Sequence, residues 1–190
     1  MEKNYIEEKT FEGINFSDIP FEQGEYESCT FVRCDLTGSI LSNSAFIECS
    51  FTSCNLSNAK VEMTSFRDAA FSGCKLTGVD FGTANSAMIA LQFSDCILDY
   101  VSFARLSLKK TEFRDCSLIG AFFDDADLSS SKFLNCNLEN AAFGRTNLEK
   151  ADLSTSYNYI IDPENNRIKK AKFSTSGIAG LLAGYDIEII

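Results

Sequence analysis

Large apolar residues recur at every fifth position along most of the chain. The series runs from Phe11 to Phe81, slips by two residues, and resumes from Phe93 to Leu153. All 28 of these positions hold Phe, Leu, Tyr or Val. An α-helix would scatter such positions around its axis, and a straight strand would point alternate ones to opposite faces. The pattern therefore predicts a chain that bends once in every five residues.

A second restriction accompanies the first. The residue two positions before each large one is mostly Ala, Cys, Ser, Thr or Val. Residues two apart on an extended segment share a face, so each repeat should place one small and one large side chain inward. The remaining residues would form a polar corner, as in residues 34–38, Cys-Asp-Leu-Thr-Gly.

The cysteines indicate how many sides make one coil. Six of the eight are spaced by 20 residues on either side of the slip: Cys34, Cys54, Cys74, Cys96, Cys116 and Cys136. Each precedes by two residues a leucine of one predicted core column: Leu36, Leu56, Leu76, Leu98, Leu118 and Leu138. The neighbouring column holds Phe31, Phe51, Phe71, Phe93, Phe113 and Phe133. Twenty residues make four five-residue sides, so the sequence predicts an all-β solenoid with four sides.

The slip lies within residues 82–92. Because the columns resume in the same order, the extra residues should bulge from one side without resetting the solenoid. Bulges that re-aim a surface are often functional. Asn85 and Met88 are therefore candidate partner contacts, and an insertion without function is an equal alternative.

The repeat resembles the motif of the pentapeptide-repeat family, Ala-(Asp/Asn)-Leu-x-x, whose central residue packs inside. The resemblance covers residues 11–153 and implies a right-handed quadrilateral β-helix. At the usual strand spacing, seven coils would make a rod about 34 Å long.

The two ends depart from the repeat. Residues 1–10 are expected to form a lead-in, 154–173 an irregular final coil, and 174–190 a cap or dimerisation segment. Within the last segment, Ser176 should cap a short helix that ends at Gly184, and 185–190 alternate like an edge strand. In several family members such a segment pairs two chains. A homodimer contact here would involve Leu181, Leu182, Ile187 and Ile189, and an intramolecular cap over the open solenoid end is the alternative.

The composition argues against catalysis. The chain has no histidine, which removes Ser-His and Cys-His nucleophile pairs and His-based zinc sites. It has no glycine-rich phosphate loop, and a filled interior should leave no pocket. We expect no enzymatic activity, no cofactor and no metal.

The expected compartment is the cytoplasm. The column positions of the cysteines suit buried, reduced core residues better than a disulfide framework. The amino-terminal segment lacks the basic and apolar regions of a signal peptide, and no segment has the length of a membrane span.

Charge points to the class of partner. The chain has 27 acidic and 17 basic residues and a net charge of −10, which argues against direct nucleic-acid binding. Solubility alone would explain most of this charge. The functional alternative is a basic protein partner, for which Asp124, Asp125 and Asp127 form the candidate cluster.

A narrower resemblance is to the Qnr and MfpA quinolone-resistance type of this family. It implies an acidic rod, about as wide as duplex DNA, that binds DNA gyrase or topoisomerase IV in place of DNA and alters quinolone sensitivity. The bulge and the carboxyl-terminal residues are similar to that group. The longer second loop of the group has no counterpart, and Lys169, Lys170 and Lys172 are additional. An interaction scaffold or immunity-type protein with another partner is the alternative.

Overall fold

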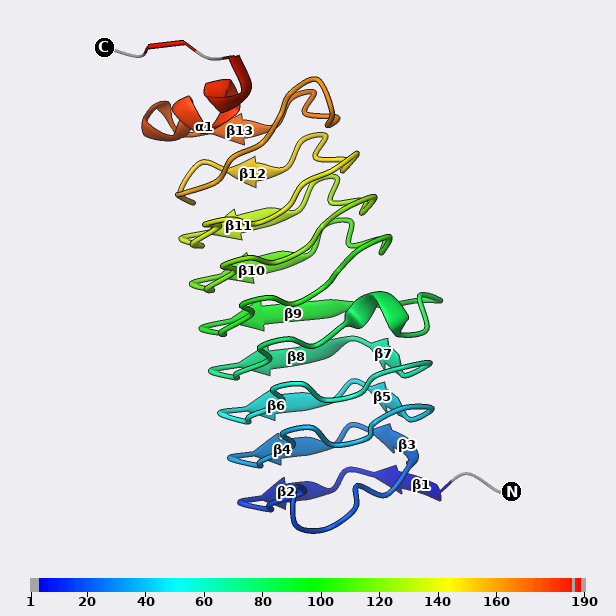
Figure 1. The fold of residues 1–190 in the computed structure, drawn as a ribbon. Coiled ribbons are helices and arrows are strands. Elements are labelled where there is room, and N and C mark those ends of the chain that lie inside the picture. Colours follow the sequence, from blue (N-terminus) through cyan, green and yellow to red (C-terminus); the bar gives the residue numbers. More distant parts are fainter. Residues whose placement is uncertain (1–3, 186, 189–190) are drawn as a thin grey trace.

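The computed structural model, which describes residues 4–185 and 187–188, is a stack of coils forming an elongated solenoid (Figure 1). A nine-stranded parallel sheet runs along one side. Its strands are β2 (Thr10–Glu12), β4 (Thr30–Val32), β6 (Ser50–Thr52), β8 (Ala69–Ser72), β9 (Leu91–Ser94), β10 (Glu112–Arg114), β11 (Lys132–Leu134), β12 (Asp152–Leu153) and β13 (Lys172–Phe173). A four-stranded parallel sheet covers a second side of the early coils, with β1 (Asn4–Glu7), β3 (Gly24–Glu27), β5 (Ala45–Ile47) and β7 (Ser65–Arg67).

Each coil has four sides, which we name faces A to D in chain order. Face A carries the nine-stranded sheet, and face D begins with the four-stranded sheet and continues through Leu108, Leu128 and Leu148. Isolated parallel bridges, such as Asp35 with Asn55 and Ile40 with Lys60, join successive coils on faces B and C. Phe31 is paired with Phe51, one 20-residue coil later. The predicted four-sided β-solenoid is thus confirmed.

The corners explain how the chain turns after so few residues. Residues with positive φ recur every five positions, for example Arg33 (51°), Gly38 (65°), Asn43 (63°) and Glu48 (53°). A left-handed residue reverses the local course of an extended chain, and Asn, Asp and Gly adopt this conformation at the lowest cost. The polar corner expected from the repeat is therefore a left-handed residue between two sides.

Hydrogen bonds explain the small inward residue. Thr64 Oγ1 donates to the carbonyl of Leu41 at 2.9 Å, and Ser156 Oγ donates to that of Phe133 at 2.8 Å. Cys54 Sγ contacts the carbonyl of Phe31 in the same way at 3.4 Å. A short donor at this position therefore binds the main chain of the preceding coil.

The eight cysteines are all buried and free. Burial raises the pKa of the Cys49 thiol to about 11, so this thiol stays neutral at physiological pH. A neutral thiol is neither a good nucleophile nor a metal ligand. No cluster of three potential metal-binding side chains was found among the residues that the structure describes.

Aromatic rings fill the interior in two interlocking columns. Phe113 stacks on Phe133 with ring centroids 4.8 Å apart and on Phe93 at 5.4 Å. It meets Phe103 edge-on at 5.6 Å. These offset-stacked and edge-on arrangements are the favourable geometries for aromatic pairs.

The bulge lies where the slip predicted it. Phe71 pairs with Phe93, so this coil contains 22 residues where the other pairings on face A span 20. It opens with η1 (Phe81–Thr83) and leaves face D after Asn85, which still bridges to Ser65. Leu91 and the half-buried Ile89 then return the chain to the core. The core columns continue in unchanged order beyond the bulge.

The solenoid extends beyond both ends of the regular repeat. β1 begins at Asn4, within the predicted lead-in 1–10, because Ile6 occupies an inward position opposite Tyr26. At the other end β13 pairs with β12 within the predicted irregular coil. The rod therefore has more coils than the seven expected from residues 11–153.

The carboxyl-terminal cap differs in detail from the prediction. It contains η2 (Thr175–Gly177), α1 (Ala179–Leu182) and η3 (Ala183–Tyr185). Ser174, rather than Ser176, accepts the capping hydrogen bond from the Gly177 amide. The expected strand over 185–190 is not seen at Tyr185, Ile187 or Glu188, and its other residues lie outside the described ones. No helix within residues 4–185 and 187–188 has the length and apolar character needed to cross a membrane.

Candidate protein interaction surface

The predicted acidic cluster is divided between two faces and largely neutralised. Asp124 and Asp125 end face C in their coil, whereas Asp127 lies on face D. Arg145, one coil later, donates from Nε and Nη2 to the two carboxylate oxygens of Asp125, both at 2.7 Å. This bidentate hydrogen bond lowers the pKa of Asp125. Asp125 is therefore already occupied by a cation of the same chain.

Asp127 is also engaged. Its Oδ1 accepts from the Ser129 amide and from Asn147 Nδ2, both at 3.0 Å. Lys109 Nζ lies 3.4 Å from its Oδ2. Asp124 alone of the three has no ion pair within the described structure, so the cluster is a weak candidate for binding a basic partner.

The unpaired negative charge lies in the amino-terminal half. Residues 4–90 contain twelve acidic and five basic residues, and 91–185 contain twelve and eleven. Of the seven ion pairs in the described structure, one joins residues of the first half, Arg33–Glu12. The other six belong to the second half: Lys109–Asp127, Arg114–Glu112, Lys132–Glu112, Arg145–Asp125, Arg167–Glu149 and Lys172–Asp152.

Carboxylates gather on face D of the first coils. Glu7 and Glu27 are direct partners across β1 and β3, and Glu25 shares β3 with Glu27. Glu48 follows at the corner after β5. Tyr5 Oη donates to Glu27 Oε2 at 2.7 Å, and this hydrogen bond raises the pKa of Tyr5 to about 12. Sequence reasoning noted the acidic start of the chain but did not place these residues together; aligning the sequence in 20-residue rows would have done so.

The two candidate residues of the bulge have different environments. Asn85 donates to Ser65 Oγ at 3.1 Å and accepts from the Ala87 amide at 3.0 Å, so its side chain shapes the bulge. Met88 has a φ of 59° and is 68% exposed. Only Met88 presents a free side chain to a partner.

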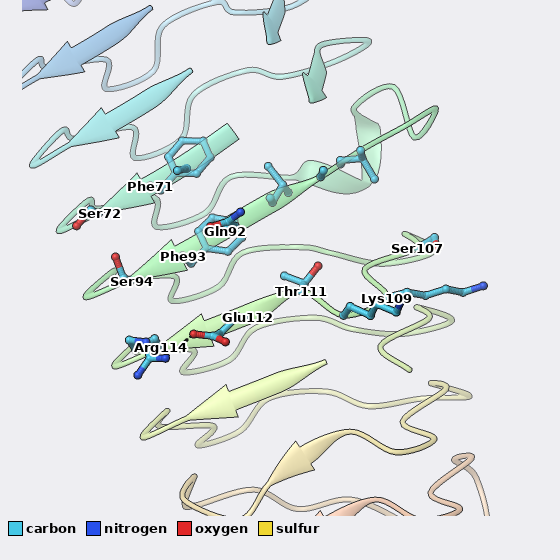
Figure 2. A pocket seen from close by; sticks show the side chains of 15 residues that line it. Phe71, Ser72, Gln92, Phe93, Ser94, Ser107, Lys109, Thr111, Glu112 and Arg114 are labelled. Atoms are coloured by element: carbon cyan, nitrogen blue, oxygen red, sulfur yellow. Dashed lines mark hydrogen bonds and ion pairs between the residues drawn. The ribbon is translucent and has the colours of Figure 1, made fainter. Parts of the chain in front are cut away.

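A groove of about 570 Å³ lies beside the bulge, open to solvent at the border of faces D and A. Residues 89–94 line one wall and 107–114 the other. Figure 2 shows Lys109 and Arg114 at opposite ends of the lining set, with Thr111 and Glu112 between them. The sequence argument foresaw a filled interior and no pocket. The groove lies outside that interior, where the two extra residues displace the start of β9.

The carboxyl-terminal candidates mostly support a cap. Leu181 is buried in the solenoid core, and the carbonyl of Gly180 accepts from the Ile161 amide at 3.0 Å. Leu182 is half-buried and Ile187 is 56% exposed. Ile189 lies outside the described residues. The cap contact is thus intramolecular at Leu181, and Leu182 and Ile187 stay available for a second chain.

One ion pair near this end predicts a pH effect. Ser154 Oγ donates to Asp152 Oδ1 at 2.6 Å, and Lys172 Nζ lies 2.9 Å from Oδ2. These contacts lower the pKa of Asp152 to about 2, against roughly 3.9 in an unfolded chain. A lowered pKa stabilises the fold above the unfolded value, and that contribution disappears as pH falls from about 4 to about 2.

The variant Asp152→Asn keeps an acceptor for Ser154 but loses the charge. We expect it to be less stable by about 1 kcal/mol at pH 7, after allowance for solvent screening, and no less stable near pH 2. Urea unfolding at both pH values measures this. An equal difference at the two pH values would contradict the assignment.

Comparison with known proteins agrees with the fold. Residues 24–92 match the family described as "Pentapeptide repeat region", and residues 82–143 match that described as "SV2A/B/C luminal domain". No curated protein matches the chain.

Two solved structures of QnrB1, described as a plasmid-mediated fluoroquinolone resistance protein, are similar over the whole chain. One trypsin-treated variant shares 21% identity, covering 100% of this chain and 92% of its own, with a TM-score of 0.77. A second trypsin-treated variant also shares 21% identity, covering 100% and 99%, with a TM-score of 0.63. At this identity the likeness shows a common fold. The five-residue repeat, the four-sided coil and these matches together identify the chain as a pentapeptide-repeat protein with a Qnr-like solenoid.

Proposed function

We propose that this protein is a non-enzymatic, acidic binding rod that contacts the DNA-binding surface of a type II topoisomerase, DNA gyrase or topoisomerase IV, and so alters quinolone sensitivity. The observation that carries the proposal is the excess of unpaired carboxylates in residues 4–90, with one ion pair among twelve acidic side chains. The likeness to QnrB1, a fluoroquinolone resistance protein, supports this choice of partner.

The geometry suits a surface that normally binds phosphates. Carboxylates on successive coils repeat at about 4.8 Å along the rod. Lys and Arg side chains that bind a DNA backbone can form charge-assisted hydrogen bonds with carboxylates as they do with phosphates. Such an interface should associate fast at low salt and weaken as salt rises.

The assignment places the partner site in the amino-terminal half, away from Asp125 and Asp127. Both of these carboxylates are paired with cations of this chain, and binding a partner there would first break those pairs. The filled aromatic core supports a non-enzymatic role, because it leaves no buried site for a substrate. Eight free, buried cysteines suit the reducing cytoplasm.

A gyrase supercoiling assay tests the proposal. Protein titrated from nanomolar to micromolar concentration, with and without a fluoroquinolone, should relieve the drug or inhibit supercoiling alone. The variant Glu25→Gln with Glu48→Gln should need about tenfold more protein for the same effect, since it removes two unpaired charges from the acidic half.

The matched control is Asp95→Asn with Glu139→Gln, which removes the same charge from exposed positions of the second half. It should behave like the unmodified protein. No effect of the unmodified protein at any concentration would reject the topoisomerase, and equal loss in both variants would reject the location.

An interaction scaffold for a different protein is the second candidate. It is favoured by exposed aromatic side chains in the middle of the rod, Tyr100 at 60% and Phe122 at 45% exposure. Replacing both by serine should leave the supercoiling effect intact if the acidic half binds the topoisomerase. A scaffold would instead lose its partner in affinity capture when these two residues are changed.

A further inference from the structure

Face D carries opposite charges at its two ends. Below the bulge its outward and corner positions include the acidic residues Glu7, Glu8, Glu25, Glu27, Glu48 and Asp68. Above the bulge the same positions include the basic residues Lys109, Lys110, Lys150, Arg167, Lys169 and Lys170. We name these sets the lower acidic set and the upper basic set.

Most members of both sets lack an ion pair in the described part of the chain. None of the lower acidic set forms one. In the upper basic set, Lys109 pairs with Asp127 and Arg167 with Glu149, and the remaining lysines are exposed without an ion pair. One face therefore holds unneutralised negative charge at one end and unneutralised positive charge at the other.

The bulge divides this face evenly. Four sides of face D precede it, at residues 4–8, 24–28, 44–48 and 64–68, and four follow, at 106–110, 126–130, 146–150 and 166–170. A two-fold axis through the bulge, perpendicular to the face, would place the first side of one chain opposite the last side of another. Glu7 and Glu8 would then lie opposite Lys169 and Lys170, and Glu27 opposite Lys150.

We propose that face D is a self-association surface, on which a second copy of this chain docks antiparallel with the two bulges near the two-fold axis. A two-fold contact uses the same patch on both subunits, so that patch must complement itself. The antiparallel arrangement brings the lower acidic set of each chain to the upper basic set of the other. A parallel arrangement would place acid against acid and base against base.

The groove beside the bulge provides room at the centre of such a contact. Ile89, Ala90 and Leu91 line it on one side and Ser107, Lys109 and Lys110 on the other, with a volume of about 570 Å³. Met88, the exposed side chain of the bulge, is the residue that the second chain would place there. The flexible thioether of methionine adapts to an irregular groove.

This surface differs from the carboxyl-terminal contact considered above, because face D includes neither Leu182 nor Ile187. It also leaves the acidic residues of faces B and C uncovered, so self-association and topoisomerase binding can be tested separately. The contact is electrostatic and should weaken when salt shortens the Debye length from about 30 Å to about 3 Å.

Sedimentation velocity over a micromolar concentration series provides the test. We expect a dimer in low salt that dissociates in molar salt. Two variants reverse one end each: Glu25→Lys with Glu48→Lys makes face D uniformly basic, and Lys150→Glu with Lys170→Glu makes it uniformly acidic. Each alone should dimerise at least about tenfold more weakly, and an equimolar mixture of the two should form a heterodimer.

The fold should tolerate these changes. Glu48, Lys150 and Lys170 occupy equivalent left-handed corners, with φ of 53°, 60° and 61°, so the solenoid already holds both side chains in this conformation. The control Asp95→Lys with Glu139→Lys alters the net charge as much as the first variant does, on faces A and B, and should dimerise normally. Circular dichroism of every variant reports the fold.

Three results would overturn the proposal. The first is a monomer at every concentration in low salt. The second is a dimer that resists salt and both charge reversals but is lost on Leu182→Asp with Ile187→Asp, which would place the contact at the carboxyl-terminal segment. The third is weakening of each variant alone with no heterodimer in the mixture.

Discussion

Replacing Phe113 by alanine is expected to lower the free energy of unfolding by about 3–5 kcal/mol, the usual cost of removing a buried phenylalanine. Phe113 has no exposed surface and contacts rings above, below and beside it: Phe93, Phe133, Phe103 and Phe123. A solenoid is held by contacts between neighbouring coils, so a cavity at this position weakens the middle of the stack. Urea unfolding followed by circular dichroism measures the loss.

Phe173→Ala is the matched control for this substitution. Phe173 lies in the same column, but it is half-buried at the carboxyl-terminal end and its nearest ring is Tyr159 at 5.6 Å. Its loss should cost about 1–2 kcal/mol, in proportion to the smaller buried area. Equal losses for the two variants would show that position along the stack does not decide stability.

Gly180→Ala should release the carboxyl-terminal cap. A Cβ at Gly180 would overlap the carbonyl oxygen of Tyr159, a main-chain atom that cannot rotate aside. The overlap would also displace the hydrogen bond from the Ile161 amide to the Gly180 carbonyl. We expect a cost of about 1–3 kcal/mol, typical of overpacking, and faster hydrogen exchange at the Ile161 amide.

Gly184→Ala tests whether this effect is specific. A Cβ at Gly184 meets no atom within 4 Å, so the substitution should change stability by less than about 0.5 kcal/mol. Faster exchange at Ile161 in this variant too would mean that the cap tolerates no change, and the overlap at Gly180 would not be the cause.

The core of this fold is readable from the sequence because its period is fixed by geometry. Any 20-residue row that places Phe31, Phe51 and Phe71 in one column also gives the register seen between β4, β6 and β8. The bulge was equally evident, since a slip of two residues has no other location. Its side-chain contacts were not, because whether Asn85 faces Ser65 depends on the path of the bulge and not on spacing.

Two other features depended on information that the repeat does not contain. Ser174, Thr175 and Ser176 are all residues that favour helix caps, so the local sequence does not select Ser174. The neutralisation of Asp125 requires Arg145 exactly one coil later, a relation between columns that a search for clusters along the chain overlooks. Charge in a solenoid is better judged from neighbours 20 residues apart.

The two ends of the rod differ in a way that bears on growth. The carboxyl-terminal end is covered by α1, whereas β1 and β2 have no further strand on their outer side among the residues that the structure describes. An uncovered strand edge can recruit another chain and start a fibre, and charged side chains oppose this. Glu7, Glu8 and Glu12 lie on that first coil, so the amino-terminal acidity also guards the solenoid against lengthening by addition of foreign strands.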